Sequence, residues 1–122
     1  MCTTEHVLAA IYGMQIDNAL IKVDSEEMPI MDGSAFAFVA AIENVGLLEQ
    51  AADREFFEFT ENQPFENIEK GVEMLGIPYN DFRITVMVDY NSPVLGSQHA
   101  SITDISQFRT EIASCRTFCF LH

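Results

Sequence analysis

The sequence is short of positive charge: it contains 6 Lys and Arg residues against 19 Asp and Glu residues, which gives a formal net charge of −13. Proteins that bind a nucleic-acid backbone or dock on anionic lipid need clusters of Lys and Arg. The charge balance therefore argues against both kinds of partner. Glycine and proline are also scarce, while 48% of the residues are hydrophobic. This composition is typical of a globular chain rather than a disordered one.

Long apolar runs and secretion signals are missing as well. No run approaches the ~20 apolar residues that span a bilayer, and the chain does not open on a basic stretch followed by an apolar one. The three cysteines (Cys2, Cys115 and Cys119) are an odd number in a chain without secretory features. Reduced thiols and a cytoplasmic location are therefore expected. The length of 122 residues suits one ordinary domain or two very small layers.

Two helices are predicted in the first half of the chain. The first begins at Thr3 or Thr4, either of which can cap it, and the second has Ser34 as its N-cap and Gly46 as its end. Residues 19–23, between the helices, are β-prone and predict a strand. The apolar positions expected to be buried are Val7, Leu8, Ile11 and Tyr12 in the first helix and Phe38, Ile42 and Val45 in the second.

The second half is predicted to be strands followed by a helix. Residues 83–90 alternate cleanly between apolar and polar side chains, the pattern of a half-buried strand. Weaker patterns predict strands at 56–60 and 100–105, whereas residues 64–71 are polar and predict a turn. The third helix is marked by Phe108, Ile112 and Cys115. The economical architecture is α+β, with two layers joined near Ala52.

The pair Glu5-His6, in the first turn of the first helix, is the most informative feature. A carboxylate beside an imidazole can supply a proton acceptor and a metal ligand. A plainer interpretation is that Glu5 complements the positive end of the helix dipole and that His6 is solvated or hydrogen-bonded. Catalytic zinc sites usually take three protein ligands, and His99 and His122 do not obviously provide the other two.

A closed structural zinc site is a rival hypothesis. Its ligands would come from two clusters, Cys2-x3-His6 and Cys115-x3-Cys119-x2-His122. The spacing is not the tight Cys-x2-Cys knuckle, and Cys115 also fits the buried face of the third helix, where core cysteines are common.

Several further residues have both a plain and a functional interpretation. Lys70, next to a glycine, is a surface lysine or a phosphate contact. Tyr90, which follows Asp89 at a strand end, covers the core edge or stacks on a base. Thr117 stands among aromatic residues that could alternate into a core.

Five segments, taken together and in this order, resemble the UDP-3-O-acyl-N-acetylglucosamine deacetylase family, the zinc amidases of lipid A (lipopolysaccharide) biosynthesis. They are TTEHVLAA (3–10), GMQIDN (13–18), PIMDGSA (29–35), VDYNSP (88–93) and IASCRTFCF (112–120). The resemblance spans essentially the whole chain. It implies two α/β sandwich domains, each a small sheet with two helices, that face each other across the active site. Residues 1–50 would be the second part of the first domain, and residues 53–122 the first part of the second.

The resemblance also implies roles for individual residues. The family hydrolyses the 2-acetamido group of its nucleotide-linked acyl sugar with Zn²⁺, so Glu5 looks like the general base and His6 like the first zinc ligand. Thr117 looks like the hydroxyl that polarises the substrate carbonyl. The residues that resemble substrate contacts are Asp89 and Tyr90 for uracil, Lys70 for the diphosphate, and Phe118 and Phe120 for the acyl and sugar groups.

The departures from the family pattern predict an incomplete site. The family's other two zinc ligands form a His-x3-Asp pair that this sequence lacks, since His99 and Asp104 have the wrong spacing. We therefore expect an internal fragment of a deacetylase that is inactive by itself. In some bacteria the family is fused to a hydroxyacyl carrier-protein dehydratase, so a fused dehydratase is a possible partner domain of the parent protein. A non-catalytic nucleotide-sugar binding module that uses Tyr90 and Lys70, and the structural-zinc interaction domain, remain alternatives.

Overall fold

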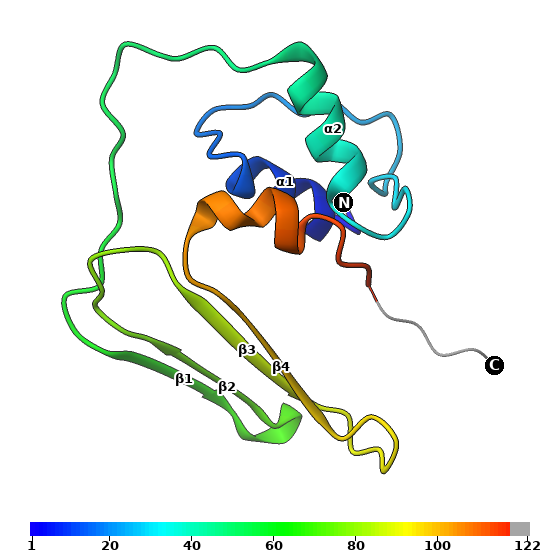
Figure 1. The fold of residues 1–122 in the computed structure, drawn as a ribbon, viewed down its shortest axis with the longest axis vertical. Helices are drawn as coiled ribbons and strands as arrows, with labels where there is room; N and C mark the ends of the chain where they lie inside the picture. The colour runs from blue at the N-terminus through cyan, green and yellow to red at the C-terminus, as the bar shows by residue number, and fades with distance from the viewer. Residues whose placement is uncertain (118–122) are drawn as a thin grey trace.

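A computed structural model describes residues 1–117, which form helices and small antiparallel sheets (Figure 1). This mixture agrees with the predicted α+β class. The helices are α1 (Glu5–Gly13), α2 (Phe36–Val45), two short 3₁₀ segments, η1 (Ile68–Lys70) and η2 (Ile105–Gln107), and a π-helix, η3 (Phe108–Ile112). The strands are β1 (Gln63–Asn67), β2 (Val72–Gly76), β3 (Ile84–Asp89) and β4 (Ser97–Ile102).

Helix α1 lies where the sequence predicts it, but it is not capped by a threonine side chain. Thr4 occupies the N-cap position with a helical backbone (φ −87°, ψ −13°) and makes no side-chain capping bond. A side-chain cap needs an extended backbone at this position, so the predicted cap is wrong. The Thr3 hydroxyl instead donates a hydrogen bond to the Glu27 carboxylate, which ties the start of α1 to a distant loop.

The loop before α2 forms hydrogen bonds with the first turn of that helix. The Ser34 hydroxyl donates to Asp32 Oδ1 (2.7 Å) and accepts from the Phe36 N–H (3.1 Å). Ser34 therefore serves the first turn, although the helix itself starts later and has Ala35 as its N-cap. Gly46 ends the helix as predicted, with its N–H donating to the Ile42 carbonyl (2.8 Å).

The four strands form two separate hairpins. Strand β1 pairs antiparallel with β2, and β3 pairs antiparallel with β4. The strand predicted at 83–90 is confirmed as β3, but its predicted half-burial is wrong because all six of its residues are exposed. Strand β4 covers part of the strand predicted at 100–105. The turn predicted at 64–71 is wrong because it contains β1 and η1. Pro64 made a strand look unfavourable from the sequence. Proline is tolerated on an edge strand, however, and both strands of a hairpin are edge strands.

Two predicted strands are absent from the part of the chain that the structure describes. Residues 19–23 and 56–60 take no strand conformation there. A β-strand needs a hydrogen-bonded neighbour, and the only pairing near the first segment is an isolated bridge between Cys2 and Glu27. The aromatic rings of Phe56 and Phe57 are left exposed.

A small core lies between the helices. It joins residues of α1, α2 and η3 with the end of β4: Ala10, Ala35, Val39, Ile102, Phe108 and Ala113. These residues come from both sides of Ala52, so the two halves of the chain share one core. Predicted core members Phe38 and Ile42 pack against it, whereas Val45 is 81% exposed in the last turn of α2, and its predicted burial is wrong.

The third helix differs from the prediction in its type. The Ala113 N–H donates to the Phe108 carbonyl (2.8 Å), which is an i+5 bond. This π-type turn contains one more residue than an α-turn. Cys115, seven residues after Phe108, is therefore rotated away from the face of the helix on which Phe108 lies. Phe108 is buried as predicted, but Cys115 is exposed, which corrects its assignment to the core.

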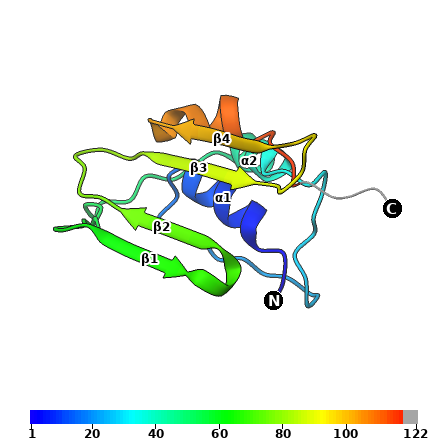
Figure 2. The same ribbon diagram turned by 90° about the horizontal axis from the view of Figure 1, so that it is seen from below.

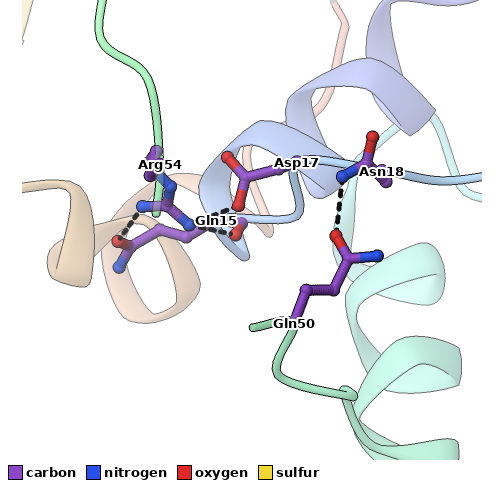
Figure 3. Close-up of polar contacts among 5 residues, drawn as sticks. All are labelled: Gln15, Asp17, Asn18, Gln50 and Arg54. Carbon is purple, nitrogen blue, oxygen red and sulfur yellow. Dashed lines mark hydrogen bonds and ion pairs between the residues drawn. The ribbon is translucent and has the colours of Figure 1, made fainter. Parts of the chain in front are cut away.

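Polar side chains join residues 50–54, which follow α2, to residues 15–18, which follow α1 (Figure 3). The Arg54 guanidinium donates to the Gln15 carbonyl and to Asp17 Oδ2, both at 2.8 Å. Asn18 Nδ2 donates to Gln50 Oε1 at 2.7 Å. The bond to Asp17 raises the pKa of Arg54. These contacts hold residues 50–54 beside the segment that leaves α1.

Candidate functional site

Glu5 and His6 occupy the first turn of α1. The Glu5 side chain is exposed at the positive end of the helix dipole. The Nε2 atom of His6 is buried and has no hydrogen-bond partner among the described residues. A buried nitrogen without a partner is costly, so the interpretation of His6 as a solvated or hydrogen-bonded residue fails at Nε2. A metal ion bound at this atom would remove the cost.

The described residues offer a metal ion few other ligands. Within residues 1–117, no three His, Cys, Asp or Glu side chains gather into a group that could hold a metal. Among these residues, the unpartnered His6 Nε2 is therefore not accompanied by further metal ligands. The structural-zinc hypothesis gains no support, because Cys2 and Cys115 are exposed free thiols, and Cys119 and His122 lie outside the described residues.

Thr117 is held by the loop that leads into α2. The Thr117 N–H donates to the Gly33 carbonyl at 2.8 Å. An earlier part of the same loop binds the chain just before Glu5, since the Met28 N–H donates to the Cys2 carbonyl at 3.1 Å. Residues 26–34 therefore contact both the segment that enters α1 and the segment that carries Thr117 (Figure 1).

Asp32 links this loop to the residue before Thr117. Its Oδ1 accepts hydrogen bonds from the Ser34 N–H (3.1 Å) and hydroxyl (2.7 Å), and its Oδ2 lies 3.7 Å from Arg116 Nε. The Ser34 hydroxyl, and then the Ser34 N–H and the Arg116 charge, hold the pKa of Asp32 below its ordinary value, although burial acts in the opposite direction. The sequence indicated only a turn at Asp32-Gly33.

The predicted nucleotide contacts lie at the turns of the two hairpins. Lys70 is exposed in η1, between β1 and β2, and its N–H donates to Asn67 Oδ1 (3.0 Å). Asp89 ends β3, and the Tyr90 N–H donates to the Gly96 carbonyl (3.1 Å). Both turns lie at the same end of the hairpins (Figure 2), away from the helices (Figure 1).

The candidate residues thus form two groups in the described part of the chain. Glu5 and His6 lie in α1 and Thr117 is bonded to the loop before α2, whereas Lys70, Asp89 and Tyr90 lie at the hairpin turns. Phe118 and Phe120 lie outside the described residues.

An apolar groove between the helices and the second hairpin was not anticipated. Its volume is about 430 Å³, and its walls include Leu8 and Tyr12 of α1 and Ile84 and Val86 of β3. The Tyr12 and Phe82 rings are in contact, with their centroids 5.5 Å apart. Leu8 and Tyr12 are exposed, so their predicted burial in the first helix is wrong. The sequence showed the helical spacing of Leu8 and Tyr12, but it did not show that they line a groove with residues of β3.

Comparison with known proteins identifies the family. The family model described as "LpxC: UDP-3-O-acyl N-acetylglycosamine deacetylase" matches residues 1–122. The chain belongs to this deacetylase family. The sequence-based prediction of the family is thereby confirmed over the full length of the chain.

Several deacetylase-family relatives cover nearly all of the chain. A protein of Chlorobaculum tepidum named bifunctional enzyme LpxC/FabZ is 47% identical over 120 residues, which are 98% of this chain and 26% of that protein. A protein of the same name from Bacteroides thetaiotaomicron is 39% identical over 119 residues, with the same two coverages. The UDP-3-O-acyl-N-acetylglucosamine deacetylase of Shewanella violacea is 41% identical over an alignment of 122 residues that covers 98% of this chain and 39% of that protein.

The chain therefore spans between 26% and 39% of the length of these relatives. This agrees with the prediction that it covers only part of a deacetylase. The bifunctional names agree with the expectation that some family members carry a second enzyme. Among the described residues, no helix is long and apolar enough to cross a membrane.

Proposed function

We propose that this chain is the part of a zinc-dependent UDP-3-O-acyl-N-acetylglucosamine deacetylase that carries its general base and one zinc ligand. The parent enzyme is an amide hydrolase that removes the N-acetyl group of its substrate during lipid A biosynthesis in the cytoplasm. The observation that carries the proposal is the buried, unpartnered Nε2 of His6, one residue from the exposed carboxylate of Glu5. The proposed reaction is the one carried out by the family to which the chain belongs.

The roles of the catalytic residues follow from their chemistry. Bound zinc supplies a Lewis acid that acidifies water and polarises an amide carbonyl. His6 contributes a neutral imidazole nitrogen to the zinc site. Glu5 accepts the proton of the attacking water. The Thr117 hydroxyl donates a hydrogen bond to the amide oxygen as that oxygen gains negative charge.

The hairpin turns are proposed to bind the nucleotide end of the substrate. Tyr90 stacks on uracil, with Asp89 as a polar contact to the same base, and Lys70 pairs with the diphosphate. Phe118 and Phe120 are proposed to line the acyl and sugar site. A nucleotide sugar carries its base and its acetamido group at opposite ends. Two separate groups of residues, one at the helices and one at the hairpin turns, are compatible with such a substrate.

The domain organisation belongs to the same proposal. Residues 1–50 are the second part of one α/β sandwich domain, and residues 53–122 the first part of the next, with the remaining zinc ligands outside the chain. The bifunctional relatives support a fused dehydratase as one form that the parent can take.

The zinc ligand is tested by metal analysis of the full-length protein encoded by the reading frame that contains this chain. We expect His6→Ala to weaken zinc binding by more than the roughly 10–100-fold that loss of an outer partner costs. His99→Ala is the matched control, because His99 is exposed on β4, and it should retain zinc. A His6→Ala protein that holds zinc as tightly as the wild type would contradict the proposed role.

A further inference from the structure

The segment that carries Thr117 touches the loop before α2 at two consecutive residues. The Thr117 N–H donates to the Gly33 carbonyl at 2.8 Å, and Arg116 Nε lies 3.7 Å from Asp32 Oδ2. One contact is a hydrogen bond to the backbone of Thr117, and the other is an ion pair between the exposed side chain of Arg116 and Asp32. Both contacts are made by consecutive residues of the same turn, Asp32 and Gly33.

Asp32 is itself held in place. Its Oδ1 accepts both hydrogen bonds from Ser34, and Ser34 is fully buried. The Ser34 hydroxyl also accepts from the Phe36 N–H at the start of α2. The carboxylate is thus anchored through Oδ1 to the helix, while Oδ2 faces Arg116. Asp32 therefore connects the start of α2 to the exposed side chain of Arg116.

Gly33 supplies the backbone shape that this turn needs. Its φ is +81°, in the left-handed region that glycine adopts without strain. A Cβ at this position would lie 3.6 Å from Thr117 Cγ2, which is an ordinary contact. Conformation rather than lack of space therefore favours glycine here, and it directs the carbonyl toward the Thr117 N–H.

We propose that Asp32 is a positioning residue, which holds Arg116 and thereby fixes the backbone and the hydroxyl of Thr117 for the deacetylation reaction. This inference rests on the role proposed above for Thr117. A hydroxyl that stabilises a developing oxyanion must lie within hydrogen-bond distance of that oxygen, and a misplacement of about 1 Å can cost about 100-fold in rate. Asp32 does not touch the substrate in this account.

A double-mutant cycle in the full-length protein tests the inference. Asp32→Ala should lower kcat by about 10- to 100-fold and leave KM unchanged, because the Thr117 hydroxyl acts mainly in the transition state. In a Thr117→Ala background, Asp32→Ala should have no further effect on kcat. A second decrease of the same size would show that Asp32 acts independently of Thr117 and would overturn the inference.

Glu43→Ala is the matched control for loss of a carboxylate. Glu43 pairs with Arg109 and so also links α2 to the C-terminal part of the chain, but no hydrogen bond or ion pair joins these two residues to Thr117 in the described part of the chain. It should leave kcat unchanged, and Arg116→Lys should restore part of the activity that Arg116→Ala loses. A Glu43→Ala protein as impaired as Asp32→Ala would indicate a general structural role for such pairs and would contradict the inference.

Amide hydrogen exchange gives a readout that does not depend on activity. The Thr117 N–H should exchange faster in Asp32→Ala than in the wild type, whereas the Ala113 N–H, which is bonded within η3, should not. Unchanged protection of Thr117 would overturn the inference even in an inactive protein. Absence of acetate release from the zinc-loaded wild type would instead contradict the proposed function, so the two failures are distinguishable.

Discussion

Gly13 of α1 lies directly against the ring of Phe108 of η3. A Cβ at Gly13 would be 2.0 Å from Phe108 Cδ1 and 2.3 Å from Cγ. Glycine is therefore required at position 13 because the Phe108 ring leaves no space for a Cβ atom, and not only because α1 ends there. The contact matters because Phe108 is buried in the core that joins the two halves of the chain.

Replacement of Gly13 by alanine should destabilise the full-length protein. Alanine favours a helix by about 1 kcal/mol over glycine, but a methyl group forced into a packed core costs about 1–3 kcal/mol. We expect a net loss of stability, measured as a lower Tm in thermal unfolding. Adding Phe108→Leu, which removes the ring, should make Gly13→Ala neutral or stabilising. A Gly13→Ala protein with a raised Tm would show that the ring does not occupy this space.

Acidic pH should weaken the contact between Asp32 and its partners. The pKa of Asp32 is lowered in the folded protein, mainly by the Ser34 hydroxyl, so the ionised carboxylate stabilises the fold. This contribution is present above the ordinary aspartate pKa of about 3.9 and is lost as the pH falls through the lower folded value. The Tm difference between wild type and Asp32→Asn should therefore be largest above about pH 5 and shrink below about pH 4. A difference that stays constant over this range would contradict the account.

Tyr90, at the turn between β3 and β4, should contribute to nucleotide binding. Base–aromatic stacking is worth about 1–3 kcal/mol per base, so Tyr90→Ala should raise the Kd for UDP by roughly 5- to 150-fold. Isothermal titration of UDP into the full-length protein measures this directly. Tyr79→Ala is the control, because Tyr79 is exposed outside the strands, and its Kd should not change. Equal Kd values for wild type and Tyr90→Ala would remove Tyr90 from the nucleotide site.

The isolated chain of residues 1–122 should be inactive and should self-associate. Its accessible surface is 10642 Å², whereas a compact protein of its mass has about 6,600 Å², and exposed apolar surface promotes association. Sedimentation should show mass that rises with concentration. Ile84→Glu, in the apolar groove, should reduce association more than Leu48→Glu, which is exposed outside the groove. A monomer that melts sharply at a concentration-independent Tm, or that releases acetate with zinc, would contradict this prediction.

Local patterns in the sequence predicted some elements because those elements depend on local chemistry. The alternation of residues 83–90 marked β3, and helical spacing with Gly46 marked α2. Strands β1 and β2 were missed because a hairpin of exposed edge strands needs little apolar patterning. The strands expected at 19–23 and 56–60 failed because pairing depends on a partner elsewhere in the chain.

The sequence could propose residues for the candidate site but not the contacts between them. Glu5 and His6 could be named from the sequence, and the family resemblance gave them roles. The contact between Asp32 and Arg116 joins segments that are distant in the sequence, and the burial of the His6 Nε2 atom is visible only in the folded chain. No spacing rule indicates that such segments meet.

The central claim is that Glu5 is the base and His6 a zinc ligand of one site. The most direct measurement is kcat for acetate release by the full-length Glu5→Gln protein at a zinc content equal to that of the wild type. Glu111→Gln, in η3, serves as the control. We predict that Glu5→Gln keeps its zinc and loses roughly 10²–10⁴-fold in kcat, while the control stays at the wild-type value. A zinc-loaded Glu5→Gln protein with wild-type kcat would contradict the account.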